Sequence, residues 1–261
     1  MINTDKIESA KSAHYYPMVN EPVIEIRNLT KSFENQSVLK NVSLKLFNGE
    51  NLVILGKSGT GKSVLIKCII GLLYPDSGTI EVFGKNLNEL NRKEFEMLRL
   101  KIGFLFQNGA LYDSMTVKQN LEFPLRRIKK NLSEKEIEEK VHEVLENVSL
   151  TEALNKMPSQ LSGGMRKRIS LARSIIVSPM IMLYDEPTAG LDPVISDEIS
   201  SLINEVQKKY KTSSIIITHD IVCARATAER IILMEDGEIY MEGSLEKFES
   251  SNDSLVRSFF K

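Results

Sequence analysis

Residues 56–63, with the sequence GKSGTGKS, have the residue types and spacing of a phosphate-binding loop, G-x-x-x-x-G-K-[ST]. Their glycines let successive backbone N–H groups turn inward, and the N-terminus of the following helix adds partial positive charge at the same point. We expect the loop to bind a polyphosphate, with Lys62 bridging the outer phosphates and Ser63 on the accompanying magnesium ion. An ordinary glycine-rich turn is the alternative. The residues assigned to this site are Gly56, Lys57, Ser58, Gly59, Thr60, Gly61, Lys62, Ser63 and Val64.

A second turn of the same character lies about a hundred residues further on, at Ser162, Gly163 and Gly164. It immediately precedes a predicted helix over 165–177, so its N–H groups would form a second anion site at a helix N-terminus. A chain with two such turns either binds two ligands, or shares its ligands with another chain.

Two acids and a histidine follow apolar strands. Asp185 and Glu186 end the predicted strand 181–186, and His219 follows the strand 213–218. At the carboxyl ends of parallel strands these side chains reach the crevice where ligands bind. Asp185 then suits the water shell of magnesium, Glu186 can accept a proton from an attacking water, and His219 can contact a terminal phosphate. The alternatives are acids that cap a turn before Pro187 and a structural histidine.

Two further residues are candidates on position alone. Gln107 follows a predicted strand at 102–106 and could reach a metal or an attacking water; a solvated loop glutamine is the alternative. Phe33 lies between predicted strands at 23–26 and 42–47 and could stack on an adenine. A core or turn aromatic is the alternative there.

The elements that position these residues alternate between strands and helices, which predicts an α/β fold. Residues 50–55 are expected to form a buried strand before the phosphate loop, and 64–72 a helix after it. A helix after Ser133 has a capping box with Glu136 and one apolar face. Further strands are predicted at 79–83 and in a closing hairpin at 231–235 and 238–241, and further helices at 92–100, at 117–125 and from Asp192 onward.

Composition narrows the class of protein. The chain has 261 residues, 34 Lys and Arg, 35 Asp and Glu and a formal net charge of -1, so nothing indicates a nucleic-acid surface. Cys68 and Cys223 are far apart without a metal-binding spacing, which indicates a reduced intracellular chain. Residues 1–20 read as a flexible polar extension without a secretory signal. No apolar stretch approaches the roughly eighteen residues of a membrane span, so we expect any membrane task to involve a partner.

The motifs together resemble the ATP-binding cassette (ABC) ATPase family over nearly the whole chain. The matches are Walker A at 56–63, the Q-loop at Gln107, the signature at 161–165, Walker B with its catalytic Glu at 181–186, the D-loop at 189–192 and the switch histidine at His219. The resemblance implies a P-loop NTPase of ABC type, with a RecA-like core sheet, an antiparallel β subdomain and a helical subdomain. It implies one domain over 21–261, with core and β parts at 21–90 and 179–261 and a helical part at 91–178.

The resemblance also implies a mechanism with ATP and Mg²⁺. Two chains would dock head to tail, with the turn 162–164 of one covering the terminal phosphate held by Lys62 of the other. Glu186 would activate the in-line water, His219 would orient the phosphate, and Gln107 would sense the magnesium ion. Asp192 of the D-loop is assigned to the nucleotide site, and Phe33 takes the place of the family's adenine-stacking aromatic. The helical part would carry the motion to a membrane permease.

Met165 departs from the glutamine that most cassettes have at the end of the signature. The run LSGGMRKR, the segment QNGALYDSMTV after Gln107 and the ending at 252–260 resemble the Mla/Mce-type branch, whose ATPases drive phospholipid or other lipid transport. Asn108 and Tyr112 differ from the branch's commoner Ser and Phe. The resemblance implies an Mce-domain lipid-binding partner and a peripheral location on the cytoplasmic face of the inner membrane.

Other functions share these catalytic residues. A cassette for another cargo, such as an amino acid or a drug, would differ only in its partner, and a regulatory cassette of the cell-division type is a further alternative. An ATPase acting on DNA or ribosomes is disfavoured, because the sequence has neither coiled-coil heptads nor a second phosphate loop.

Overall fold

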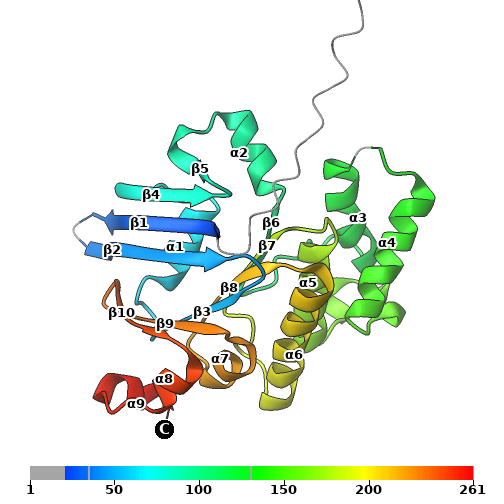
Figure 1. Cartoon of the computed structure of the whole chain (residues 1–261). Coiled ribbons are helices and arrows are strands. Elements are labelled where there is room, and N and C mark those ends of the chain that lie inside the picture. Colours follow the sequence, from blue (N-terminus) through cyan, green and yellow to red (C-terminus); the bar gives the residue numbers. More distant parts are fainter. Residues whose placement is uncertain (1–20, 35, 130, 261) are drawn as a thin grey trace, which may run out of the picture.

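The computed structural model describes residues 21–34, 36–129 and 131–260. A mostly parallel sheet forms its centre (Figure 1). Neighbouring strands along it are parallel except at β10, which closes the edge antiparallel to β9. In spatial order its strands are β10 (Glu238–Gly243), β9 (Arg230–Glu235), β3 (Asn51–Leu55), β8 (Ser213–Thr218), β7 (Ile181–Asp185) and β6 (Ile102–Leu105). The predicted hairpin at 231–241 is confirmed, and its first strand also joins the parallel sheet through β3.

A second, antiparallel sheet lies over one face of the central sheet. Its order is β2 (Gln36–Phe47), β1 (Pro22–Phe33), β4 (Ser77–Val82) and β5 (Lys85–Asn86). β1 and β2 are longer than the predicted strands, because they pair along their full length and bring Phe33 opposite Gln36. Phe33 therefore belongs to the end of a strand rather than to a separate connection.

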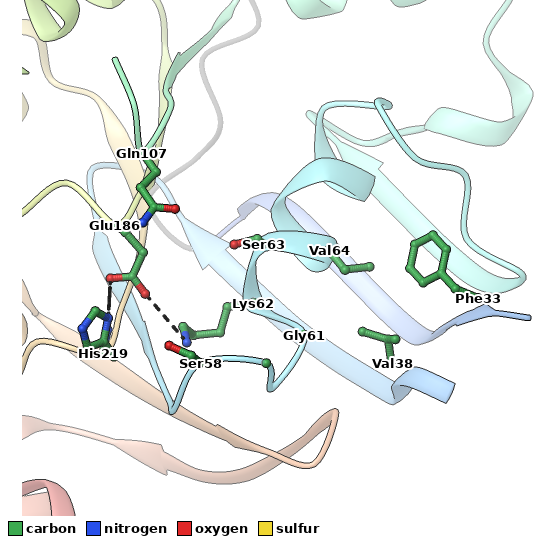
Figure 2. A pocket seen from close by; sticks show the side chains of 11 residues that line it. Phe33, Val38, Ser58, Gly61, Lys62, Ser63, Val64, Gln107, Glu186 and His219 are labelled. Atoms are coloured by element: carbon green, nitrogen blue, oxygen red, sulfur yellow. Dashed lines mark hydrogen bonds and ion pairs between the residues drawn. The ribbon is translucent and has the colours of Figure 1, made fainter. Parts of the chain in front are cut away.

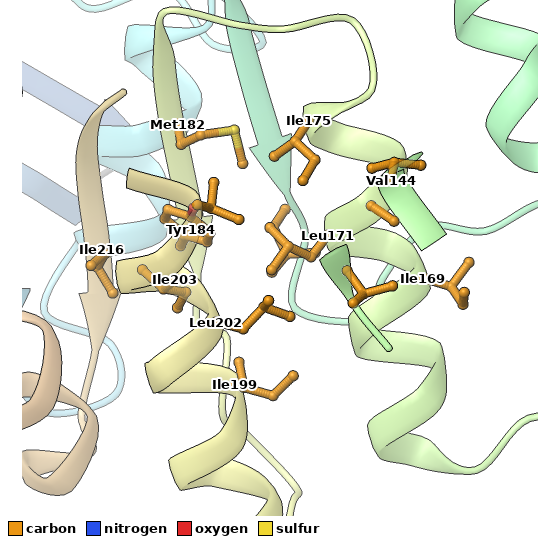
Figure 3. Packing of buried hydrophobic residues seen from close by; sticks show 14 of the residues in the cluster. Val144, Ile169, Leu171, Ile175, Met182, Tyr184, Ile199, Leu202, Ile203 and Ile216 are labelled. Atoms are coloured by element: carbon orange, nitrogen blue, oxygen red, sulfur yellow. The ribbon is translucent and has the colours of Figure 1, made fainter. Parts of the chain in front are cut away.

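Alternation along the parallel strands divides the core into two layers. One face, which includes Leu52, Ile54 and Leu183, packs with α1 (Lys62–Ile69) and the antiparallel sheet. The other face, which includes Met182 and Tyr184, packs with the helices α5 (Gly163–Ile175) and α6 (Pro193–Tyr210), as Figure 3 shows. The smaller helices α7 (Ile221–Thr227), α8 (Leu245–Glu249) and α9 (Ser254–Phe260) complete this second layer.

A group of helices beside the sheet includes the helix for which the sequence predicts a capping box. α3 (Val117–Ile128) begins at a capping box of Thr116 with Gln119, and α4 (Glu134–Asn147) at the predicted box of Ser133 with Glu136. Both helices pack with α5, on the side of the central sheet away from the antiparallel sheet (Figure 1). Ile137, Val141, Leu145 and Val148, the apolar face predicted for α4, are all buried.

Two elements inside the range 91–178 lie outside this helical group. α2 (Arg92–Arg99) buries Leu98 in the layer with α1 and the antiparallel sheet, and β6 is an edge strand of the central sheet. The α3–α5 grouping therefore starts after β6, where the chain leaves the sheet at Gln107. Short 3-10 turns η1 (Leu87–Glu89), η2 (Thr151–Ala153) and η3 (Pro158–Gln160) connect the remaining elements. In the described parts of the chain, no helix is both long and apolar enough to span a bilayer.

Candidate active site

The loop between β3 and α1 packs closely against the backbone of β9 and β2. At Gly56 a Cβ atom would lie 2.5 Å from the carbonyl oxygen of Met234, and at Gly61 it would lie 2.7 Å from that of Val38. Gly61 also has φ of 97° as the N-cap of α1, a conformation that favours glycine. No side-chain hydrogen bond caps this helix at Gly61, and the N–H groups of an uncapped helix N-terminus suit an anionic ligand. The sequence thus needs glycine here for space as well as for backbone curvature.

A cavity of about 430 Å³ opens beside this loop (Figure 2). The structure brings predicted residues from five separate segments to it, and the residues that line it are Phe33, Val38, Ser58, Gly59, Gly61, Lys62, Ser63, Val64, Gln107, Glu186 and His219. Val38 is the one lining residue that the sequence did not indicate. It carries no polar group, and only the pairing of β1 with β2 places it near Phe33.

Charged groups meet at the inner end of the cavity. The Lys62 ammonium, buried at 4% exposure, donates to the carbonyl oxygens of Gly56 at 2.7 Å and Lys57 at 2.8 Å. It lies 3.9 Å from Oε1 of Glu186, whose Oε2 lies 2.8 Å from Nδ1 of His219 (Figure 2). Burial lowers the pKa of Lys62, while the nearby Glu186 and Asp185 carboxylates oppose that shift. A buried cation and a carboxylate–histidine pair therefore face one small volume.

Oxygen atoms suited to a hard cation lie next to this volume. The Ser63 hydroxyl donates to Oδ1 of Asp185 at 3.1 Å, and Gln107 lines both this cavity and a neighbouring one that Asp185 lines. Burial raises the pKa of Asp185, and the Ser63 hydrogen bond opposes that rise. Hydroxyl, amide and carboxylate oxygens are ligands that Mg²⁺ prefers. Among the described residues no cluster of three His, Cys, Asp or Glu forms a metal cage. Ser63, Gln107 and Asp185 supply oxygens of these kinds, so this donor set fits a magnesium ion.

Glu186 has an unusual backbone. Its φ is 49°, in the left-handed region, and its N–H donates to the carbonyl oxygen of Ile217 at 2.9 Å. Its own carbonyl oxygen accepts from Nζ of Lys167 at 3.2 Å. Burial lowers the pKa of Lys167 to about 8, opposed by Asp185 and Glu186. The sequence did not indicate Lys167, because it lies between Arg166 and Arg168 in what reads as a solvated charge run.

The second glycine turn lies apart from the cavity. Ser162 caps α5 by accepting from the backbone N–H of Met165 at 3.2 Å, and Ser162 and Gly163 are exposed. Gly164 is buried against Ile195, where a Cβ atom would lie 2.7 Å from Cγ2. Asp192 caps α6, accepting from the N–H groups of Val194 and Ile195 at 3.1 Å each. None of the turn residues, nor Asp192, lines the cavity.

The outer end of the cavity is apolar. Phe33 is 42% exposed, and Nζ of Lys31 lies 5.5 Å from its ring centroid. Figure 2 shows Phe33, Val38 and Val64 at the opposite end from Glu186 and His219. An aromatic face and two small apolar side chains suit a flat base, whereas the inner end suits phosphates.

The segment after Gln107 is shaped from within the helical group. The fully buried Asn120 accepts from the N–H of Tyr112 at 2.8 Å, and the two hydrogens of its Nδ2 are shared among the carbonyl oxygens of Tyr112, Met115 and Thr116, at 3.1 Å each. The Arg173 guanidinium donates to the carbonyl oxygen of Ala110 at 2.7 Å and lies 4.8 Å from the ring centroid of Tyr112. α3 and α5 thus fix a loop that the sequence indicated only as an irregular junction.

Comparison with known proteins assigns a family to this arrangement. Residues 39–189 match the sequence model described as ABC transporter. The chloroplastic protein TRIGALACTOSYLDIACYLGLYCEROL 3 of Arabidopsis thaliana is 38% identical, over 92% of this chain and 74% of its own length. The probable ribonucleotide transport ATP-binding protein mkl of Mycobacterium leprae is 40% identical, over 90% and 68%. Among solved structures, the dimeric post-hydrolysis state of the ATP-binding cassette MJ0796 with ADP and Pi matches with a TM-score of 0.78 and 34% identity, over 85% of this chain and 98% of that one.

Proposed function

The chain belongs to the ABC transporter family and is an ATPase subunit of that family, and we propose that two copies hydrolyse ATP at shared sites to drive a membrane permease. The observation that carries this proposal is the cavity where Lys62, Glu186 and His219 face the N-terminus of α1. That combination binds a triphosphate and supplies a proton acceptor beside it.

Each side chain then has a role set by its contacts. Lys62 and the N–H groups of the loop neutralise the outer phosphates of ATP, and Phe33 stacks on the adenine. Glu186 accepts the proton of the attacking water. His219, whose Nδ1 is engaged by Glu186, presents its other ring nitrogen to the terminal phosphate.

Ser63 and Gln107 would hold Mg²⁺, and Asp185 would hold a water of its shell. When bound, the ion supplies charge neutralisation between the outer phosphates. The hydrogen bond between Ser63 and Asp185 holds the two side chains together beside the proposed position of the ion.

The turn 162–164 completes the site from a second chain. Its exposed residues, Ser162 and Gly163, lie at a helix N-terminus outside the cavity of their own chain, so an ATP from another copy is a fitting ligand. The solved structure of the MJ0796 cassette, which is dimeric and holds ADP and Pi, supports a dimer. Asp192, at the start of α6 beside the turn, would lie at the same interface.

The test is Glu186→Gln, which keeps the shape of the side chain and removes the proton acceptor. We expect ATP turnover to fall at least about 100-fold while ATP binding stays within about twofold, with an ATP-dependent dimer that persists in size-exclusion chromatography. The exposed Glu205→Gln is the matched control, with wild-type turnover. Wild-type turnover in Glu186→Gln would refute the assigned base.

For the cargo we propose a phospholipid or related lipid, moved by a permease that has an Mce-domain partner. We place this chain at the cytoplasmic face of the inner membrane, as a peripheral subunit. The support is the run LSGGMRKR, the segment after Gln107 and the ending at 252–260, together with a relative whose name is that of a galactolipid. The relative named for ribonucleotide transport favours a different cargo.

Purification of the tagged chain from its native membranes in mild detergent separates these cargoes. Mass spectrometry is expected to identify a multi-span permease and an Mce-domain protein. A permease of another class would retain the ATPase and reject the lipid, and a partner from the cell-division apparatus would favour the regulatory alternative.

A further inference from the structure

One buried charged residue beside the cavity has no part in the roles given above. Lys167, on α5, is 6% exposed, and its Nζ donates to the backbone carbonyl oxygen of Glu186 at 3.2 Å. A buried ammonium is costly unless hydrogen bonds and nearby opposite charge compensate it. The carboxylates of Asp185 and Glu186 provide that charge. The buried charge of Lys167 is therefore compensated by groups in and beside the turn at Glu186.

That turn is held at both of its polar backbone groups. Glu186 follows the last residue of β7, and its φ of 49° would cost a non-glycine residue about 1 kcal/mol or more without support. Its N–H is fixed to Ile217 of β8, and its carbonyl group is fixed to Lys167. This backbone conformation directs the Glu186 carboxylate to Nδ1 of His219 and toward Lys62.

The helix that carries Lys167 begins at the second glycine turn. Three residues before Lys167, Gly164 packs against Ile195, so closely that a Cβ atom would lie 2.7 Å from Cγ2. Gly163 likewise faces Leu191, with 3.6 Å between its Cβ position and Cδ2. The first turns of α5 therefore lie close to the segment 186–195 at Gly163 and Gly164 and are hydrogen-bonded to it at Lys167, so displacement of one would displace the other.

We propose that Lys167 is a positioning residue for Glu186, which fixes the Glu186 peptide and ties it to the helix that begins at Ser162–Gly164. This inference rests on the proposed role of Glu186 as the proton acceptor. When the turn of one copy docks on the ATP held by a second copy, Lys167 links that turn to the Glu186 carboxylate of the first copy. The two nucleotide sites of a dimer are coupled by this contact.

The test compares Lys167→Met, which fills the space without a donor, with Lys167→Gln, which retains an N–H donor. For the Met variant we expect kcat for ATP to fall about 10- to 100-fold while KM stays within about twofold, because the base loses its support while the phosphate loop and Phe33 are unchanged. Lys167→Gln should recover at least about fivefold of that loss. The exposed Lys208→Met, which removes a similar charge from α6, is the control with wild-type kcat.

A merely structural lysine would give a different pattern: kcat and KM would change together with the unfolding temperature, and Gln would restore nothing. That pattern, or a Met variant with kcat within about twofold of wild type, overturns the inference. If Lys167→Met does not fold, Lys167→Leu replaces it as the donor-free variant. Glu186→Gln is measured in parallel. If Glu186→Gln retains turnover, the assigned base is wrong; if it loses turnover while Lys167→Met keeps it, only the positioning role is wrong.

Discussion

The two glycine turns of this chain have the same local chemistry and opposite surroundings. The loop 56–63 leads into α1 at the carboxyl edge of the central sheet, and side chains from distant segments face it across one cavity. The turn 162–164 leads into α5 at the surface, and its closest packing is to its own neighbour α6. Both present N–H groups at a helix N-terminus.

The two turns differ in the chemical groups that their own chain places around them. Around the first, a cation, a carboxylate and a histidine are already within reach of one another. Around the second, the Ser162 hydroxyl is engaged by the N–H of Met165, and no residue of the turn lines the cavity. We therefore propose that the first turn is a binding site within one chain, and that the second becomes one when another copy brings a ligand.

The largest effect is expected at the first turn. Lys62→Ala removes the buried ammonium that faces Glu186, and we expect ATP affinity to fall by at least about 100-fold, the equivalent of about 3 kcal/mol. Isothermal titration with ATP measures it in the single chain. The exposed Lys135→Ala should bind like wild type. Unchanged affinity in Lys62→Ala would remove the distinction between the two turns.

A change at the second turn should spare binding and abolish turnover. Gly163 is exposed, and a Cβ atom there would make an ordinary contact with Cδ2 of Leu191 at 3.6 Å, so Gly163→Asp fits its own chain but sets a carboxylate against the phosphate of another. We expect ATP binding within about twofold of wild type and turnover lower by about 100-fold. Gly163→Ala, which adds the atom without the charge, should lose less than about tenfold. Equal losses in the two variants would show that charge at this turn does not matter.

Packing beneath the second turn is tested by Gly164→Ala. The added Cβ atom would lie 2.7 Å from Cγ2 of Ile195, which is too close. The shift needed to accommodate it should lower the free energy of unfolding by about 1–3 kcal/mol. Denaturant titration measures the change. Ile195→Ala in the same chain removes the opposing atoms and should recover part of the loss, so additive losses in the double variant would contradict the packing.

The smallest effect is expected at the base end of the first site. Phe33→Ala removes the aromatic face, and we expect KM for ATP to rise about fivefold, near 1 kcal/mol, with kcat within about twofold. Phe33→Tyr retains the ring and should restore KM. Equal KM in Phe33→Ala and wild type would exclude stacking on Phe33.

The elements and the chemical groups were predictable, whereas several of the contacts were not. Continuous apolar runs marked β3, β7 and β8, and capping residues marked α4 and α6, because these signals are local. Val38 reaches the cavity only through a hairpin register, and Lys167 reaches Glu186 across the gap between a helix and a sheet. Neither contact leaves a pattern in neighbouring residues. The left-handed backbone of Glu186 is likewise set by Ile217 and Lys167, which are remote in sequence.

The most direct measurement mixes two inactive variants. Glu186→Gln and Gly163→Asp are combined in equal amounts before ATP is added, and turnover is compared with that of each variant alone. If every catalytic site is built from two chains, mixed dimers hold one site with both Glu186 and an unaltered turn, and roughly a quarter of wild-type turnover should return. Turnover no higher than the sum of the separate variants would contradict a shared site.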